Sequence, residues 1–290
     1  VQPLLRRYPV SGVPSPSQPA VLPRKPLAPL PNMPSAILNF NGMNETNSAC
    51  NCLPPDTNGD VGKNQYVQSV NVSFQVFNKS TGASLAPPTT YNALFSALGT
   101  SIPCGNNQNE GDPIVFYDQL ADRWVISDFA FPSSSGPFYQ CIAVSKTGDP
   151  VSGGYWLYAF QVDSSNPSWL GDYPKLAMWP DAYYMSANMF AMPASTFQGV
   201  EVYALNRALM LNGTGAPTPT IVAFTVTTGL RAASSLLPAR FRFGAPPNGT
   251  PEYFAAIDSP SNSATVLNTV HIWKFHVDFT TPLNSTFGMG

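Results

Sequence analysis

The sequence predicts an all-β protein, a propeller-like array of about four antiparallel blades preceded by a proline-rich extended arm. A unit at 111–127 returns in altered form at 171–186, and a fainter copy starts at Pro55. Its apolar runs are short, rich in β-branched and aromatic residues, and bounded by Gly, Pro and Asp, as strands are. Repeats about 60 residues apart, each one small sheet, are typical of propellers.

Residues 1–36 form the predicted arm, because ten prolines fall within 1–35. Proline at this density blocks helix and ladder hydrogen bonds and favours polyproline II. The arm either packs along the domain, binds a partner, or is a stalk or propeptide remnant. Residues 37–290 form the predicted propeller-type domain.

The sequence of this domain predicts the following strands and helices, in chain order. Alternation of apolar residues from Val70 to Val76 predicts one long strand, or two joined by a bend. A short helix is expected at 91–99, and one helical turn at 206–211. Complete units are expected at 111–162, 171–226 and 252–279. The last strand places five apolar or ring-bearing side chains on one face: His271, Trp273, Phe275, Val277 and Phe279.

Several motifs resemble a family of secreted bacterial β-propeller-type proteins that has no assigned activity. They are CNCLPPDTNGDVGKNQYVQSVNVSFQVFNKSTG, GDPIVFYDQLADRW, YQCIAVSKTGDP, DYPKLAMWPDAYYMS and IWKFHVDF. The resemblance covers about residues 37–287. It implies an N-terminal portion of a longer protein, and it carries over no catalytic residues.

The composition argues against some classes of function. A net charge of -2 gives no basic surface for nucleic acid, and no apolar run reaches membrane-spanning length. The chain starts without Met and without a signal-like apolar core, so we expect a mature or trimmed product. We expect a secreted, extracellular protein.

The four cysteines point to the same compartment. Cys50 and Cys52 form C-x-C, unlike the C-x-x-C of zinc or redox sites. Two disulfides are favoured over free thiols. Adjacent Cys50 and Cys52 bond each other poorly, so each is expected to reach one of Cys104 and Cys141.

Sequons give a weaker indication of secretion. The expected glycosylation sites are Asn44, Asn71, Asn78, Asn212, Asn248 and Asn284.

A turn-rich loop offers a candidate metal site. Its oxygen-bearing side chains follow the spacing that wraps a turn around a hard cation, as in integrin-type propeller blades. It departs from the EF-hand, since Val61 and Val67 replace the Gly and Glu. A structural Ca²⁺ is one reading and a simple Asx turn is the other. The predicted ligands are Asp56, Asn58, Asp60 and Asn64.

Aspartates recur at predicted strand ends, where propellers bring several blades together. Paired carboxylates there would suit glycoside hydrolysis, whereas Asp in a turn can simply fix the backbone. The catalytic candidates are Asp112, Asp118, Asp172 and Asp181; Asp122, Asp128 and Asp149 belong to the same series.

Other chemistry is less supported. His271 and His276 point to opposite strand faces and cannot share a metal. No nucleophile elbow, phosphate loop or dinucleotide fingerprint occurs. The aromatics of 155–184 form either a stacking platform or core: Tyr155, Trp156, Trp169, Tyr173, Trp179, Tyr183 and Tyr184.

Two functions remain. The first is an extracellular propeller-type glycoprotein that binds or scaffolds a glycan, a surface or a protein partner. The second is a polysaccharide-active hydrolase or lyase with paired carboxylates in the channel. Because an unclosed ring leaves a blade face bare, we expect another polypeptide at the face near Trp273 and Phe275, either a C-terminal fragment or a second copy. The alternative is a small closed four-bladed ring.

Overall fold

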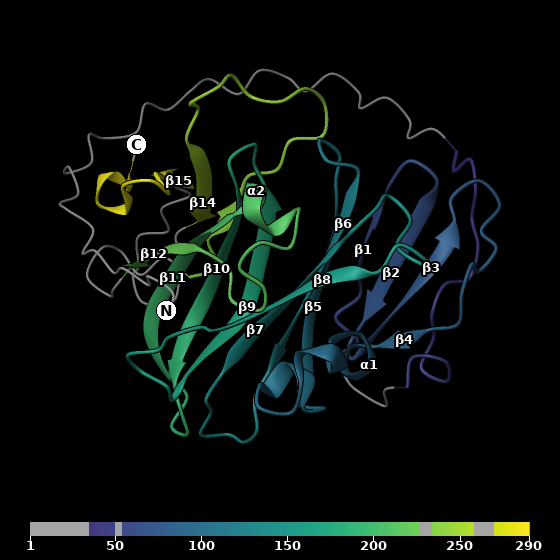
Figure 1. The fold of residues 1–290 in the computed structure, drawn as a ribbon, viewed down its shortest axis with the longest axis horizontal. Coiled ribbons are helices and arrows are strands. Elements are labelled where there is room, and N and C mark those ends of the chain that lie inside the picture. The colour runs from purple at the N-terminus through teal and green to yellow at the C-terminus, as the bar shows by residue number, and fades with distance from the viewer. Residues whose placement is uncertain (1–34, 50–53, 227–233, 258–269, 290) are drawn as a thin grey trace, which may run out of the picture.

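The computed structural model describes residues 35–49, 54–226, 234–257 and 270–289 (Figure 1). These form four four-stranded antiparallel sheets, each pairing its strands in sequence order, so the predicted all-β propeller-type architecture is confirmed. The proline-rich arm at 1–34 lies outside the described residues. In Figure 1 the blades follow one another from blade 1 on the right to blade 4 on the left.

The strands are divided among the blades as follows. Blade 1 holds β1 (Asn58–Val61), β2 (Gln65–Val70), β3 (Ser73–Asn78) and β4 (Thr89–Thr90). Blade 2 holds β5 (Asn109–Asp118), β6 (Arg123–Ala130), β7 (Tyr139–Ser145) and β8 (Tyr155–Gln161). Blade 3 holds β9 (Trp169–Met178), β10 (Ala182–Ala191), β11 (Thr196–Asn206) and β12 (Ile221–Val226). Blade 4 holds β13 (Leu237–Pro238), β14 (Glu252–Ile257), β15 (Val270–His276) and β16 (Thr286–Met289).

Helices are short. Both helical segments expected from the sequence are present, as α1 (Tyr91–Phe95) with η1 (Ser96–Leu98), and as α2 (Arg207–Met210). Two further 3₁₀ turns are η2 (Pro103–Gly105) and η3 (Pro282–Asn284). Among the described residues, no helix has the length and apolar character needed to cross a membrane.

The segment from Val70 to Val76 is two strands joined by a tight turn. Val72 sits in that turn with a φ of 66°, a left-handed conformation that β-branched residues rarely adopt. In the resulting hairpin Val70 lies opposite Ser73, while Phe74 lies opposite Ser69. The turn therefore places Val70 and Phe74 on opposite faces, so of the two expected arrangements the one with two strands joined by a bend is correct.

Both faces of the middle blades are buried, because strand side chains alternate between faces. In β10, Tyr183 and Met185 pack against blade 2, while Ala182 and Tyr184 pack against blade 4. In β6, Trp124 and its alternate neighbours face blade 1. Tyr183 and Tyr184 are thus core residues that pack on opposite sides of the same blade.

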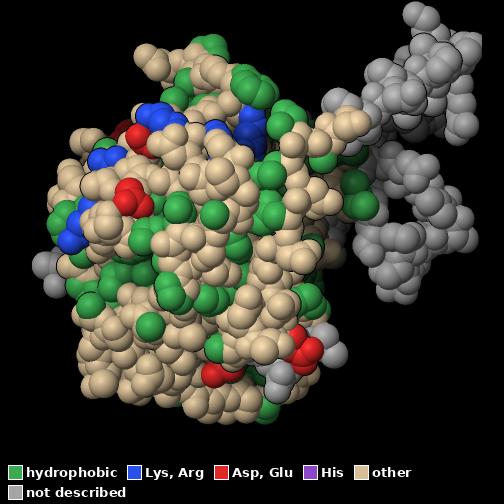
Figure 2. All heavy atoms as spheres, turned by 90° about the vertical axis from the view of Figure 1, so that its right-hand side faces the viewer, with side chains coloured by type: hydrophobic (Ala, Val, Ile, Leu, Met, Phe, Trp, Pro, Cys, Tyr) green, Lys and Arg blue, Asp and Glu red, His purple; other side chains and the backbone are tan. Residues whose placement is uncertain are grey.

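The outward faces of the two terminal blades, blade 1 and blade 4, differ in what covers them. Blade 1 is covered by the chain itself, since the Phe40 ring lies 6.1 Å from Tyr66 and 5.4 Å from Phe77. Figure 2 shows this end, where Lys and Arg side chains gather in the upper part and most of the face is uncharged. In blade 4, Trp273 and Phe275 are buried against blade 3 at 3% and 0% exposure. Trp273 and Phe275 therefore pack within the chain itself, and a partner polypeptide stays a prediction. The opposite face carries the exposed residues Leu237, Ile257, Val270 and Ile272.

One disulfide joins Cys104 of η2 to Cys141 of β7, with the two Cα atoms 5.8 Å apart. It ties the connection between blades 1 and 2 to the middle of blade 2. The expected pairing of each with Cys50 or Cys52 is therefore wrong, because the two cysteines that lie near each other across the blade interface bond directly. Cys50 and Cys52 themselves lie outside the described residues.

Candidate functional site

The inner strands β1, β5, β9 and β13 contact one another in succession and surround the propeller axis. At or just before each inner strand, one non-glycine residue adopts a left-handed backbone conformation. The four residues, with their φ values, are Asp56 (43°), Asp112 (49°), Tyr173 (51°) and Ser235 (57°). Such residues are uncommon, and strained backbone tends to gather at functional sites.

Backbone amides at these positions tie neighbouring blades together. The N–H of Asp112 donates to Asn71 Oδ1 at 3.1 Å, and that of Tyr173 donates to Asp112 Oδ2 at 3.2 Å. The N–H of Ser235 donates to Asn188 Oδ1 at 2.7 Å. In each case the acceptor belongs to the preceding blade, so Asn71, Asp112 and Asn188 each fix the backbone of the next inner strand.

We use the term carboxylate cluster for Asp56, Asp112, Asp172, Tyr173 and Lys175. Burial, and after it the carboxylates of Asp172 and Asp56, together raise the pKa of Asp112 to about 6. Asn71 Nδ2 donates to Asp56 Oδ2 at 2.7 Å, so one asparagine links Asp56 to the Asp112 backbone. Acidic groups from three blades therefore interact at one end of the inner strands.

The cluster also presents an aromatic ring and an ammonium group. Tyr173 is 50% exposed. Lys175 Nζ lies 3.1 Å from the centroid of that ring and donates to the Pro174 carbonyl at 3.1 Å. Burial lowers the pKa of Lys175, against the opposing effect of Asp112, Asp172 and Asp56. Of the aromatics between 155 and 184, the other members are half-buried or buried, so Tyr173 is the exposed one.

Asp128 of β6 lies behind the cluster. Its side chain is completely buried, and hydrogen bonds from the backbone N–H groups of Gly111 and Phe129 lower its pKa against the effect of burial. Burial raises the pKa of Asp128 well above its usual range, and the charges of Asp112 and Glu110 add to this. Sequence reasoning grouped Asp128 with turn aspartates, but it lies within a strand.

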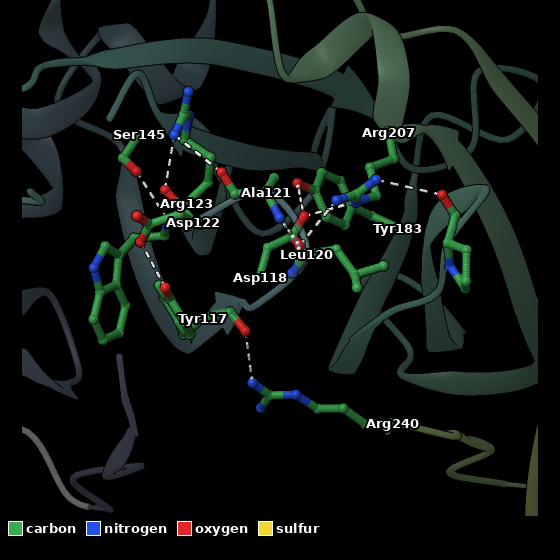
Figure 3. Close-up of polar contacts among 12 residues, drawn as sticks. Tyr117, Asp118, Leu120, Ala121, Asp122, Arg123, Ser145, Tyr183, Arg207 and Arg240 are labelled. Atoms are coloured by element: carbon green, nitrogen blue, oxygen red, sulfur yellow. Dashed lines mark hydrogen bonds and ion pairs between the residues drawn. The ribbon is translucent and has the colours of Figure 1, made fainter. Parts of the chain in front are cut away.

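Asp118 lies at the opposite end of β5 and is structural (Figure 3). Arg207 binds it through Nε at 2.6 Å and Nη2 at 3.0 Å, and the Tyr183 hydroxyl donates to it at 2.8 Å. The same carboxylate accepts the N–H groups of Leu120 and Ala121 in the turn. No oxygen of Asp118 is left for a substrate.

Asp181 also lies at this opposite end, in the turn between β9 and β10. It accepts the Tyr184 hydroxyl at 3.1 Å, and burial raises its pKa. Of the four catalytic candidates, the structure therefore brings together Asp112 and Asp172 and separates Asp118 and Asp181 from them. Asp122 and Asp149 are also engaged locally, with Tyr117 and Lys63 for the first and Ser152 and Val151 for the second.

The residues predicted to bind calcium do not fit that ion. Asn58 Oδ1 accepts the Val115 N–H at 2.7 Å. Asp60 Oδ2 accepts the Tyr117 N–H at 2.7 Å, while Arg242 Nη1 lies 2.7 Å from Oδ1. Asn64 contributes its backbone carbonyl to the Lys79 N–H. Within the described ranges, no three His, Cys, Asp or Glu side chains are arranged to hold one metal ion.

Arginine occupies the place that the sequence assigned to a cation. Arg240 Nη2 also binds Asp60 Oδ2, and it donates to the Tyr117 carbonyl at 3.2 Å. Burial alone would raise the pKa of Asp60, but the hydrogen bonds from Arg240 and the Tyr117 N–H outweigh it and lower the pKa. Phe241 packs on Trp179 with ring centroids 5.7 Å apart. Residues 240–242 thus join blade 4 to blades 1, 2 and 3 at the end opposite the carboxylate cluster.

The predicted glycosylation sites fall into two groups. Asn71 is buried and holds Asp56, and the half-buried Asn78 accepts the N–H groups of Ser80 and Thr81. These two side chains are engaged in the folded protein. The exposed members are Asn44, Asn212, Asn248 and Asn284.

Comparison with known proteins gives a likeness of architecture. No protein-family model matches the chain, and no curated protein matches it either. An α-L-arabinanase of Cellvibrio cellulosa, solved with arabinohexaose, is 13% identical, with 81% of this chain and 76% of that chain covered and a TM-score of 0.38. An exo-1,5-α-L-arabinanase from a bovine ruminal metagenomic library is 12% identical, with coverages of 81% and 77% and a TM-score of 0.39. A GH43_1 enzyme from Xanthomonas citri is 10% identical, with coverages of 81% and 87% and a TM-score of 0.34.

Proposed function

We propose that this chain is an extracellular, propeller-type glycoprotein that binds a glycan at the carboxylate cluster. One observation carries the proposal: Asp56, Asp112 and Asp172, from three blades, interact beside the exposed ring of Tyr173. Carboxylate oxygens accept hydrogen bonds from sugar hydroxyls, and an exposed aromatic ring stacks on the apolar face of a sugar.

Access to the cluster follows from the chain's own contacts. Arg240 binds Asp60, lies 5.3 Å from the Phe116 ring and donates to the Tyr117 carbonyl, all on inner strands at the far end. Asp118 lies six positions after Asp112 on β5, which is about 20 Å of extended chain. A ligand therefore reaches the cluster from the Tyr173 end.

The extracellular setting rests on separate observations. The bond between Cys104 and Cys141 belongs in an oxidising compartment. Four of the predicted sequons carry an exposed asparagine, which suits a glycoprotein. Together with the motif resemblance, these features support a secreted bacterial propeller-type protein.

A second candidate is polysaccharide hydrolysis at the same cluster. The observation that favours it is the pKa of Asp112, which burial and the neighbouring carboxylates raise to about 6. A general acid works best when its pKa lies near the operating pH. In this reading Asp112 donates the proton to the leaving sugar oxygen, and Asp172 or Asp56 is the partner carboxylate.

The test is calorimetric titration of the full chain with a panel of oligosaccharides, followed by chromatography of the same mixtures. We expect saturable binding by the wild type and loss of binding in Tyr173→Ala and Asp172→Asn. Asp149→Asn, which removes one carboxylate from a turn at the other end, is the matched control and should bind normally. Shortened sugars in the chromatogram, lost in Asp112→Asn, would favour the hydrolase. Absence of binding across the panel would reject a glycan site.

A further inference from the structure

Most of the lysine and arginine side chains that the structure describes lie at one end of the propeller, opposite the carboxylate cluster. Figure 2 shows Lys and Arg side chains gathered in the upper part of the blade 1 side. We call the following six side chains the basic patch: Lys63, Lys79, Arg123, Lys146, Arg240 and Arg242. They come from the residues that follow β1, β3, β5 and β7 and from the segment after β13.

Contacts between turns bring three of these cations together at blades 1 and 2. Lys63 Nζ lies 2.8 Å from Asp122 Oδ2, and Arg123 Nη1 donates to the Asp122 carbonyl at 2.8 Å. Lys79 Nζ donates to the Gly62 carbonyl at 2.8 Å, next to Lys63 in the chain. The turns after β1, β3 and β5 therefore adjoin one another.

The two arginines of the segment after β13 reach the same place. Both Arg240 and Arg242 bind the Asp60 carboxylate, which also accepts the Tyr117 N–H at 2.7 Å. The Tyr117 hydroxyl donates to Asp122 Oδ1 at 2.5 Å. Tyr117 thus links the carboxylate that holds the arginines to the carboxylate that holds Lys63.

Lys146 lies in the loop after β7, which adjoins the same turn. A Cβ added to Gly148 would lie 2.6 Å from Asp122 Oδ1, so the loop backbone passes directly beside that carboxylate. Lys146 Nζ itself lies 4.2 Å from the centroid of the Trp156 ring. All six cations therefore belong to one connected surface.

Positive charge exceeds negative charge on this surface. Three aspartates lie among the six cations: Asp60, Asp122 and Asp149. Lys79 donates to a backbone carbonyl and Lys146 lies over a tryptophan ring, and within the described ranges neither forms an ion pair. The net charge of -2 is thus an average over a basic end and an acidic end.

Exposed apolar side chains stand on the same turns. Val61, Leu120 and Val151 are 47%, 46% and 42% exposed, in the turns after β1, β5 and β7. Phe243 directly follows Arg242 and is 97% exposed. Single exposed apolar residues are common, but apolar side chains among polar ones at one surface mark protein or membrane contacts.

The exposure of Phe243 follows from the contacts of the residues before it. Arg240 and Arg242 are held by Asp60, and Phe241 between them packs on blade 3. These three residues fix the segment against the propeller. The ring of Phe243 is consequently held at the surface, beside the basic patch.

We propose that the basic patch docks this protein onto a lipid bilayer with anionic headgroups, with the Phe243 ring inserted between the headgroups. Lysine and arginine attract anionic lipids, and exposed apolar side chains gain free energy when they enter the interface. A soluble polyanion would use the cations but would leave Val61, Leu120 and Phe243 exposed. The bilayer would cover the end opposite the carboxylate cluster, so the inference is independent of the proposed glycan site.

The experiment is co-sedimentation of the full chain with vesicles of phosphatidylcholine alone or mixed with phosphatidylglycerol. We expect binding to the mixed vesicles only, and weaker binding as salt is added, because salt screens exposed charges. Lys79→Gln and Lys146→Gln should each weaken binding about fivefold. Lys274→Gln, at an exposed position of blade 4, is the charge control and should bind as the wild type does.

Variants at Phe243 test insertion. Phe243→Ala should weaken binding to the mixed vesicles about tenfold without lowering the melting temperature, because the ring is exposed in the folded protein. Ile37→Ala, at another exposed apolar position, is the control and should bind normally. Brominated lipid chains should quench the added fluorescence of Phe243→Trp.

Each contrary result has a clear meaning. Equal binding to both kinds of vesicle, or none to either, overturns the proposal. So does binding that both lysine variants leave unchanged, or an unquenched Phe243→Trp. If soluble polygalacturonate binds as tightly as the mixed vesicles and Phe243→Ala weakens neither, the patch recognises a polyanion and the bilayer proposal is wrong. None of these results affects the test of glycan binding at the carboxylate cluster.

Discussion

Asp118 and Arg207 form a two-point ion pair between blades 2 and 3, with Nε–Oδ2 at 2.6 Å and Nη2–Oδ1 at 3.0 Å (Figure 3). The carboxylate is fully buried, and the Tyr183 hydroxyl donates to the same oxygen that Nε binds. A planar guanidinium that meets a carboxylate at two points fixes the orientation of both groups. The pair therefore sets the angle at which two blades meet.

Removing Arg207 should be strongly destabilising, because it leaves Asp118 buried without its counter-ion. We expect Arg207→Ala to lower the free energy of unfolding by about 3–5 kcal/mol. Urea denaturation followed by tryptophan fluorescence measures this. Lys63→Ala is the control: its pair with Asp122 is solvent-exposed, so its loss should cost less than about 1 kcal/mol. A similar small loss in both variants would contradict the structural role.

A substitution at Asp60 tests whether this carboxylate pairs with arginines or binds calcium. Because two arginines and two backbone N–H groups already occupy its carboxylate, Asp60→Asn should lower the melting temperature. Excess chelator should leave the wild-type melting temperature unchanged, since arginine side chains neutralise this carboxylate. Differential scanning calorimetry with and without chelator gives both results. If a calcium ion stabilises this loop, the chelator will instead lower the transition through linkage.

Because of Glu252, the free energy of unfolding should fall as the pH rises from acid to alkaline. Burial raises the pKa of Glu252 to about 9, from an ordinary value of 4.5, so the folded state retains a proton that the unfolded chain releases. The resulting stabilisation is complete below pH 4.5 and is lost as the pH rises through about 9. Glu252→Gln, which mimics the protonated acid, should therefore lose less stability between pH 5 and about pH 9 than the wild type does.

Urea denaturation at several pH values within that window tests the Glu252 prediction. Glu45→Gln, at an exposed site, is the control and should follow the wild-type curve. Parallel curves for the wild type and Glu252→Gln would show that Glu252 is charged in the folded protein at neutral pH.

The open face of blade 4 should mediate association with another copy of the chain. Cross-strand pairing aligns Leu237, Ala255 and Ile272 in one row, with Ile257 and Val270 beside it, so the exposed apolar side chains share one face. We expect native mass spectrometry to show a dimer, and Ile272→Lys to convert it to the 31.1 kDa monomer. Leu120→Lys, at an exposed turn, should leave the dimer intact. A wild-type monomer would rule out a second copy as the partner.

Local sequence determined the strands of this protein. Alternation of apolar residues, together with Gly, Pro and Asp at the breaks, was sufficient to locate the blades and the short helices, because strands and turns depend on nearby residues. The opposite orientations of Tyr183 and Tyr184 also follow from sequence, because side chains alternate along a strand. That both sides would be buried depended on the two neighbouring blades.

Tertiary structure alone decided what each polar residue does. Asp112 and Asp118 lie on the same strand, yet one joins the carboxylate cluster and the other binds Arg207, 89 residues away. Asp60 carried the spacing of a calcium ligand, but Arg240, 180 residues later, supplies its positive charge. The disulfide between Cys104 and Cys141 likewise depends on how the folded chain packs. Charge pairing and disulfide bonding need atoms that packing brings close together. The spacing of residues along one strand does not predict how neighbouring blades pack.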